Sequence, residues 1–156
     1  MAIIFITGLS GVGKSTVLEQ LGREGYHVVD TDYNYVRAIK NGATTERVWD
    51  EEKIINLIKR SKQSHLFISG CYSNQSKFYR HFKHVVLLKA ELDVMLERVT
   101  KRTTNSYGKS AEEMAEIIEG YKYVLPLLEK SSDIMIDTSE VNVEIVCRRL
   151  KELLYM

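Results

Sequence analysis

The residues best suited to carry chemistry form a glycine-rich loop near the start of the chain. Residues 8–16 read GLSGVGKST and match the pattern G-x-x-x-x-G-K-[ST], which is typical of a loop that binds nucleotide phosphates. In such a loop the glycines let several backbone N–H groups turn toward phosphate oxygens. Lys14 can then place its ammonium group on the β- and γ-phosphates, while the hydroxyl of Ser15 can bind Mg²⁺. The predicted phosphate-binding residues are Gly8, Ser10, Gly11, Val12, Gly13, Lys14, Ser15 and Thr16.

The segments on either side of this loop fit the context that the pattern requires. Residues 2–7 are an apolar run of the kind expected for a buried parallel strand. After the loop, apolar residues recur at helical spacing over 15–24, and Gly25 is a typical helix stop. A helix that begins at the loop adds the positive end of its dipole to the anion site. Strand, loop and helix together predict a site for nucleotide phosphates.

Two carboxylates follow the second predicted strand. Asp30 and Asp32 stand on either side of Thr31 and lie beside the phosphate loop if the first two strands are neighbours. We expect Asp30 to act with Ser15 on the Mg²⁺ side of the site, and Asp32 to orient an attacking hydroxyl or accept its proton. The alternative is that Asp32 only caps a helix that begins at Tyr33.

A basic segment farther along the chain is the second strong signal. Arg98 and Arg102 are four residues apart, so they share one face of a predicted helix, and a polar loop with Gly108 follows them. Two guanidinium groups on a flap can neutralise charge on the oxygens of a phosphoryl group during transfer. We therefore expect a lid at about 98–112 in which both arginines are catalytic. The alternative is a solvated helix end, which the helix dipole also favours.

The remaining candidates follow other predicted strands. Three residues that end the last strand, Asp137, Thr138 and Ser139, can lie against a nucleotide base, although turns after strands favour the same residue types. An acceptor pocket is also expected, because small and hydrogen-bonding residues follow the third strand and the stretch 33–49 is rich in aromatic and cationic residues. The predicted acceptor residues are Asp32, Arg37, Arg47, Tyr72 and Asn74.

Alternating strands and helices are predicted to position these side chains. We expect strands at about 2–7, 26–30, 65–69, 84–89 and 133–137, and helices at about 15–24, 33–40, 45–63, 91–103, 111–130 and 141–154. This order predicts an α/β fold in which helices cover both faces of a parallel sheet. Ligands of such sheets bind at the carboxyl ends of the strands. Ser110 and Glu113 form a capping-box pattern at the start of the fifth helix, which Pro126 is expected to kink or interrupt.

Composition sets broad limits on the class of protein. A length of 156 residues suits one domain, and a net charge of +1 gives no general case for binding nucleic acid or membranes. No apolar stretch approaches 18 residues and no signal peptide is recognisable, so we expect a cytoplasmic protein with no membrane span. Cys71 and Cys147 are expected to be free thiols, with Cys147 in the core.

With these motifs in hand, the whole chain resembles the small P-loop kinases of the nucleoside monophosphate kinase group. In layout it is similar to shikimate and gluconate kinases and to small proteins often labelled AAA-family ATPases. The resemblance implies one three-layer domain over 1–156 with strand order 2-3-1-4-5 and acceptor-side helices at about 33–63. It also implies ATP and Mg²⁺ as cofactors and catalytic roles for Lys14, Asp32, Arg98 and Arg102. Shikimate kinases carry three glycines after the third strand, where this chain has Ser69-Gly70-Cys71.

These features predict a kinase that moves the γ-phosphate of ATP to a small-molecule hydroxyl or phosphate acceptor, acting as a monomer or dimer. Two alternatives stay open. One is a nucleotide-binding regulatory or partner-binding module that hydrolyses ATP slowly and needs no Asp32. The other is a kinase of polynucleotide ends, which calls for a continuous basic and aromatic groove. The near-neutral charge disfavours the second alternative.

Overall fold

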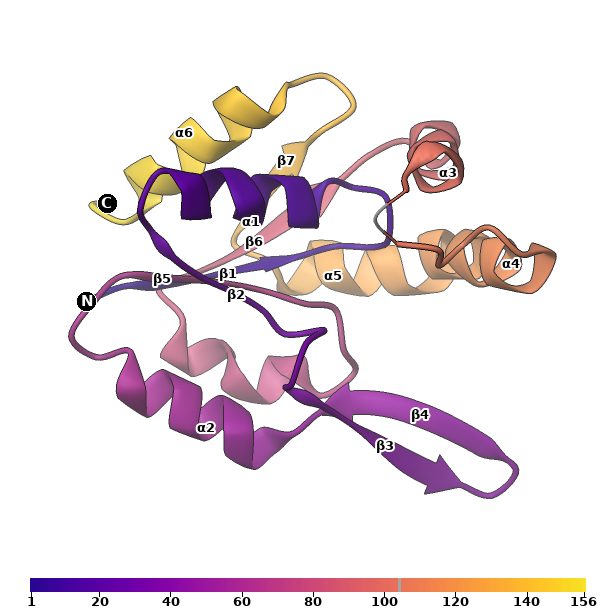
Figure 1. Ribbon diagram of the computed structural model, residues 1–156, viewed down its shortest axis with the longest axis horizontal. Helices are drawn as coiled ribbons and strands as arrows, with labels where there is room; N and C mark the ends of the chain where they lie inside the picture. The colour runs from indigo at the N-terminus through magenta and orange to yellow at the C-terminus, as the bar shows by residue number, and fades with distance from the viewer. Residues whose placement is uncertain (104) are drawn as a thin grey trace.

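A five-stranded parallel sheet forms the centre of the protein, for which a computed structural model describes residues 1–103 and 105–156 (Figure 1). Its strands are β1 (Ile3–Thr7), β2 (His27–Asp30), β5 (Leu66–Ser69), β6 (His84–Lys89) and β7 (Ile134–Asp137). They lie in the order β2-β5-β1-β6-β7, and every neighbouring pair is parallel. All five predicted strands are confirmed. Numbered by their rank among these five, they also have the predicted order 2-3-1-4-5.

Helices cover both faces of this sheet, as the alternating pattern predicts (Figure 1). They are α1 (Lys14–Arg23), α2 (Glu51–Arg60), α3 (Leu92–Lys101), α4 (Ala111–Glu119), α5 (Leu125–Ser131) and α6 (Val143–Leu153), with a short 3-10 helix η1 (Gln75–His81). The apolar sides of α1, α3 and α6 pack together on one face of the sheet. On the other face α2 and η1 share a second core, and α5 packs against Leu87. Cys147 is buried in the first core, and both cysteines are free.

The central strand brings the candidate residues to one edge. Every residue of β1 is buried, and the register places Phe5 between Ile68 of β5 and Val85 of β6. Because all five strands are parallel, their carboxyl ends meet at the same edge of the sheet. The glycine loop leaves β1 there and leads directly into α1. Asp30 and Asp137 end β2 and β7 at this same edge.

The segment between β2 and α2 differs from the prediction. In place of helices at 33–40 and 45–50, β3 (Val36–Asn41) and β4 (Thr44–Trp49) form an antiparallel hairpin (Figure 1). The cause is local, because Asn41 pairs with Thr44 and leaves Gly42-Ala43 as a two-residue turn, in which Gly42 takes the positive φ of 68° that such turns favour at their first position. Of the predicted acceptor-side helices, only the part that became α2 is correct.

One long helical stretch follows α3, and the predicted lid, at about 98–112, joins the two. Ser110 caps α4 by accepting a hydrogen bond of 3.1 Å from the Glu113 N–H, as its sequence predicts. A π-helical turn, η2 (Gly120–Val124), separates α4 from α5, and Pro126 lies in the first turn of α5. Thr104, inside the predicted lid, lies outside the described residues. Within the described ranges, no helix is both long and apolar enough to cross a membrane.

Candidate functional site

The glycine loop wraps closely around the ends of neighbouring elements. A Cβ atom at Gly8 would lie 2.3 Å from the carbonyl oxygen of Leu88, and one at Gly11 would lie 2.7 Å from that of Met95. Gly11 also has a φ of 87°, which side-chain-bearing residues rarely adopt. The loop therefore requires glycine at both positions, for reasons of space and of backbone conformation. This packing sets the path of the N–H groups that precede α1.

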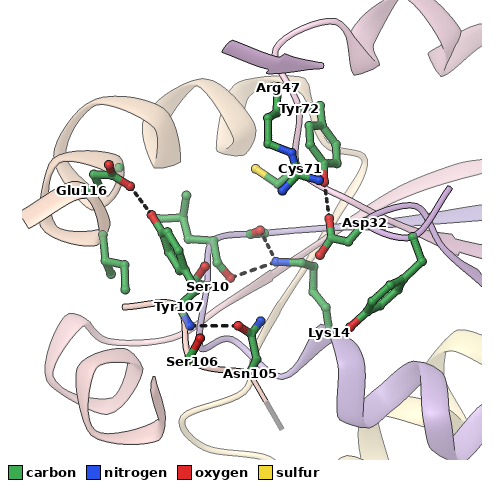
Figure 2. Close-up of a pocket in the computed structure, with 15 residues that line it drawn as sticks. Ser10, Lys14, Asp32, Arg47, Cys71, Tyr72, Asn105, Ser106, Tyr107 and Glu116 are labelled. Carbon is green, nitrogen blue, oxygen red and sulfur yellow. Dashed lines mark hydrogen bonds between the residues drawn. The ribbon is translucent and has the colours of Figure 1, made fainter. Parts of the chain in front are cut away.

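Lys14 spans the mouth of this loop. Its ammonium group donates hydrogen bonds to the carbonyl oxygens of Gly8 and Leu9, the latter at 2.9 Å (Figure 2). Burial lowers the pKa of Lys14, while the nearby Cys71, Asp32 and Asp30 oppose that shift. Because this ammonium forms no ion pair with any described carboxylate, it is suited to receive an anion. The carbonyl oxygens of the loop carry only partial negative charges, and a phosphate oxygen would supply the full negative charge that balances the ammonium.

The two carboxylates after β2 have different surroundings. Asp30 is half-buried and accepts a hydrogen bond of 3.0 Å from the Asp32 N–H; burial raises its pKa. Asp32 is exposed and accepts a hydrogen bond from the hydroxyl of Tyr72 (Figure 2). Burial, together with this bond to Asp32, raises the pKa of Tyr72. No helix begins at Tyr33, so the capping alternative for Asp32 is wrong.

A main cavity of about 780 Å³ joins these groups (Figure 2). It is lined by Gly8, Leu9, Ser10, Lys14, Asp32, Tyr33, Arg47, Cys71, Tyr72, Asn105, Ser106, Tyr107, Glu116, Ile117 and Gly120. The phosphate loop, the residues after β2, the hairpin, the loop after β5 and the lid segment thus face one space. A volume of this size is typical of small-molecule sites. Of the predicted acceptor residues, Asp32, Arg47 and Tyr72 line this cavity.

The other two predicted acceptor residues lie elsewhere. Asn74 clamps the base of the hairpin, since its side chain accepts from the Trp49 N–H at 3.1 Å and donates to the Trp49 carbonyl at 3.0 Å. Arg37 and Asn74 both line a separate recess between the hairpin and the start of α2. Neither is among the residues described around the main cavity.

Neither of the predicted lid arginines is among the described residues that line the main cavity. Arg98 donates to the Gly11 carbonyl at 3.3 Å and to the hydroxyl and carbonyl of Thr138 at 2.9 and 2.7 Å. Arg102 donates to the carbonyls of Asn105 and Tyr107 at 3.2 and 2.7 Å. In this conformation both guanidinium groups hold loops in place.

Thr138 connects the last strand to the phosphate loop. Its hydroxyl donates to the Val12 carbonyl at 2.7 Å while it accepts from Arg98. Val12, Arg98 and Thr138 also line an apolar recess of about 340 Å³, whose other walls include the first turn of α1 and the start of α6. Asp137 accepts from the Ser139 N–H at 2.9 Å and so shapes the turn after β7. An apolar recess beside a phosphate loop is suited to a nucleotide base.

Sequence reasoning missed the lid residues that reach the cavity. The hydroxyl of Tyr107 donates to Glu116 at 2.5 Å, and Asn105 accepts from the Tyr107 N–H at 2.9 Å (Figure 2). Gly108 makes this possible: a Cβ there would lie 2.3 Å from Val99, so the loop packs tightly on α3. The one available signal was the position of Gly108 in a polar loop, whereas the catalytic roles were predicted for Arg98 and Arg102, which precede it.

A glycine-rich loop between the central strand and a helix, at the carboxyl edge of a parallel sheet, defines a P-loop nucleotide-binding protein. Solved structures share this fold along almost the whole chain. A shikimate kinase from Bacteroides thetaiotaomicron has a TM-score of 0.66 with 19% identity, over 99% of both chains. A shikimate kinase from Acinetobacter baumannii, in complex with shikimate, has a TM-score of 0.67 with 15% identity, over 99% of this chain and 93% of that one. At these identities the likeness shows the fold of shikimate kinase-like P-loop proteins.

Sequence comparison then gives the particular family. Residues 4–119 match a family described as an AAA domain, and the chain belongs to that family. A nucleotide-binding protein of Petrotoga mobilis is 32% identical over 150 residues, covering 88% of this chain and 47% of the relative. One from Thermosipho africanus is 27% identical over 154 residues, covering 97% and 54%. The chain spans about half the length of these curated relatives.

Proposed function

We propose that this protein is an ATP- and Mg²⁺-dependent kinase that transfers the γ-phosphoryl group to a hydroxyl or phosphate of a small molecule. One observation carries the proposal: Asp32 and Lys14 line the same cavity, so a carboxylate faces the place where a γ-phosphate would meet Lys14 (Figure 2). A module that only binds a nucleotide has no need of such a group. The shikimate kinase-like fold supports the same reading.

Each residue has a role in this proposal. The phosphate loop and Lys14 bind the ATP phosphates, and the apolar recess at Thr138 takes the base. Asp32 orients the acceptor hydroxyl and accepts its proton, while Tyr72 holds the carboxylate in place through its hydrogen bond. Catalysis then rests on in-line positioning and on neutralising charge at the phosphoryl oxygens. Arg98 and Arg102 act through the loops that they hold.

The residues around the loop fit a magnesium ion. Ser15 is exposed in the first turn of α1, and Asp30 is a half-buried carboxylate that forms no ion pair with any described residue. Both offer hard oxygen ligands, which Mg²⁺ prefers when phosphate oxygens and water complete its shell. Among residues 1–103 and 105–156, no cluster of three His, Cys, Asp or Glu side chains offers a separate metal site. When bound, Mg²⁺ would neutralise charge on the transferring phosphate.

The lid remains part of this proposal. Tyr107 and its neighbours already border the cavity, so closure of the segment 98–112 over bound ATP would exclude water as a competing acceptor. Amide hydrogen exchange with and without a non-hydrolysable ATP analogue measures this closure. Slower exchange in the complex is expected at residues 105–109. Equal exchange rates with and without the analogue would show that this segment does not close over ATP.

The decisive test is acceptor-dependent release of ADP across a panel of metabolites and nucleotides, run with the wild type and with Asp32→Asn. We expect at least one compound to raise ADP release above water-only hydrolysis. Asp32→Asn should lower that acceptor-dependent rate by about 10²-fold or more, because the proton acceptor is lost, while ATP affinity stays within about twofold. Water-only hydrolysis for every compound, unaffected by Asp32→Asn, would instead favour the slow nucleotide-binding module.

A further inference from the structure

The β3–β4 hairpin combines a fixed base with an exposed outer part. At the base, Trp49 is fully buried and its ring N–H donates to the Thr31 hydroxyl at 2.8 Å, which in turn donates to the Ser69 carbonyl at 2.7 Å. The hairpin is thereby fastened to the carboxyl ends of β2 and β5. Residues 37–47 are exposed, and Figure 1 shows the hairpin extending away from the main sheet. The hairpin is therefore anchored beside the site and exposed over residues 37–47.

The strand register gives the hairpin two chemically different faces. Ala38 pairs with Arg47 and Lys40 pairs with Thr45, so these four side chains share one face. Arg47 lines the main cavity, and this face is thus turned toward the site. It carries two cations and no carboxylate. Glu46, by contrast, lies on the opposite face, together with Arg37.

Arg47 is the one arginine among the described residues that lines the main cavity, and its guanidinium forms no hydrogen bond or ion pair with any of them. Figure 2 shows it beside Cys71 and Tyr72. Its charge acts on the Tyr72 hydroxyl, lowering a pKa that burial and Asp32 raise. An unpaired guanidinium next to the proposed acceptor-binding group is suited to bind a phosphate or carboxylate through two parallel hydrogen bonds.

We propose that the hairpin binds an anionic group of the acceptor, with Arg47 as its main ligand and Lys40 as a second cation farther out. This inference rests on the proposed kinase function and narrows its substrate class. The acceptor has a hydroxyl that reaches Asp32 and, at some distance from it, a phosphate or carboxylate. Arg47 pairs with Ala38, and Lys40 lies two residues farther along β3 than Ala38, which corresponds to about 7 Å along a strand. The site therefore favours an extended anionic acceptor over a compact neutral one.

Matched compounds test the proposal through activity. Glycerol, glycerate and glycerol 3-phosphate share hydroxyls and differ in their anionic group, and ribose with ribose 5-phosphate forms a second set. We expect the wild type to prefer the anionic members in kcat/KM. Arg47→Gln should lower kcat/KM for those members by about 10- to 100-fold, chiefly through KM, and remove the preference, because a hydrogen-bonded charge pair is lost. Arg37→Gln, a matched change on the opposite face of the hairpin, should leave the preference intact. Equal effects of the two substitutions, or an equal loss for neutral and anionic acceptors, would overturn the proposal.

A binding measurement separates this proposal from the kinase function. Phenylglyoxal labels accessible arginines, and mass spectrometry of the protein loaded with a non-hydrolysable ATP analogue can follow Arg47 and Arg37 separately. Inorganic phosphate should slow the labelling of Arg47 more than that of Arg37, and Lys40→Gln should reduce this protection. Labelling of Arg47 that is indifferent to phosphate overturns the anion site, whatever the ADP assay shows. Protection of Arg47 without transfer to any acceptor supports the anion site and refutes the kinase.

Discussion

The two sides of the main cavity are built in different ways. On the nucleotide side, backbone packing fixes the phosphate loop: Gly8 lies against Leu88, Gly11 against Met95, and Thr138 hydrogen-bonds to Val12. On the proposed acceptor side, two buried residues at the end of β4, Val48 and Trp49, anchor a hairpin whose outer positions are exposed. The first side offers few positions that can change without disturbing the sheet. The second can change its side chains at little cost in stability, and under the proposed function such changes would alter the acceptor that the site takes.

The largest expected effect tests the anchor of the acceptor side. Trp49→Ala removes a fully buried ring that packs edge-on against Phe5 and Phe78, and it leaves the Thr31 hydroxyl without its donor. We expect a loss of about 3–5 kcal/mol in the free energy of unfolding, measured by urea denaturation. Ile39→Ala, farther along the hairpin at 39% exposure, should cost less than about 1 kcal/mol. Similar losses for the two would show that the hairpin has no anchored base.

On the nucleotide side, Lys14→Ala removes the ammonium group at the mouth of the loop. We expect phosphoryl transfer or ATP hydrolysis to fall by about 10²-fold or more, because an oriented charge that stabilises the transferring group is lost. The fold should remain, since among the described residues the Lys14 side chain bonds only to carbonyl oxygens of its own loop. ADP release measures the rate and urea denaturation the fold. Turnover at the wild-type level would contradict the assignment of the loop.

The same contrast explains what could be predicted from the sequence. The phosphate loop is local, with Lys14 bonded to carbonyls five and six residues away, so its sequence pattern is sufficient to identify it. The five strands were also readable, because buried parallel strands are continuous apolar runs. Arg98 is different, since its partner Thr138 is 40 residues distant and no local pattern shows the contact. The spacing of Arg98 and Arg102 indicates a shared helix face and does not reveal where the guanidinium groups point.

The hairpin is a different kind of failure, because its sequence did contain a usable signal. Asn41-Gly42 followed by the β-branched residues of β4 is typical of a hairpin, whereas the resemblance to small kinases implies helices at this place. Here the local pattern was the better guide. The acceptor region is the part of this fold in which the chain departs from the helices expected by resemblance.

A smaller effect is expected where the last strand holds the phosphate loop. Thr138→Val keeps the shape of the side chain but removes the hydroxyl that joins Val12 to Arg98. We expect ATP affinity to fall by about tenfold, which is the ordinary worth of one or two such hydrogen bonds. Isothermal titration with a non-hydrolysable analogue measures this change. Thr100→Val, on the exposed side of α3, is the control. An equal loss of ATP affinity in Thr100→Val would show that the Thr138 hydroxyl has no specific role in nucleotide binding.

The most gradual expected effect is a pH dependence of nucleotide binding. Burial lowers the pKa of Lys14 below the ordinary 10.5 in the free protein, and bound phosphates favour the charged form. The free protein therefore loses the ammonium at a lower pH than an ordinary lysine would, and binding must restore that proton. ATP affinity should then decline as pH rises from 7 toward 10, by at most about tenfold per pH unit.

Lys14→Arg provides the control for this decline, because its guanidinium stays charged over the whole range. Its affinity for the same analogue should be weaker at pH 7 yet change less with pH than that of the wild type. A decline of equal slope in both proteins would assign the titration to another group. Arg47→Gln, on the other side of the cavity, should keep the wild-type slope, since no hydrogen bond joins Arg47 to Lys14 or its loop among the described residues. Different responses of the Lys14 and Arg47 variants would confirm that the two sides of the cavity are electrostatically separable.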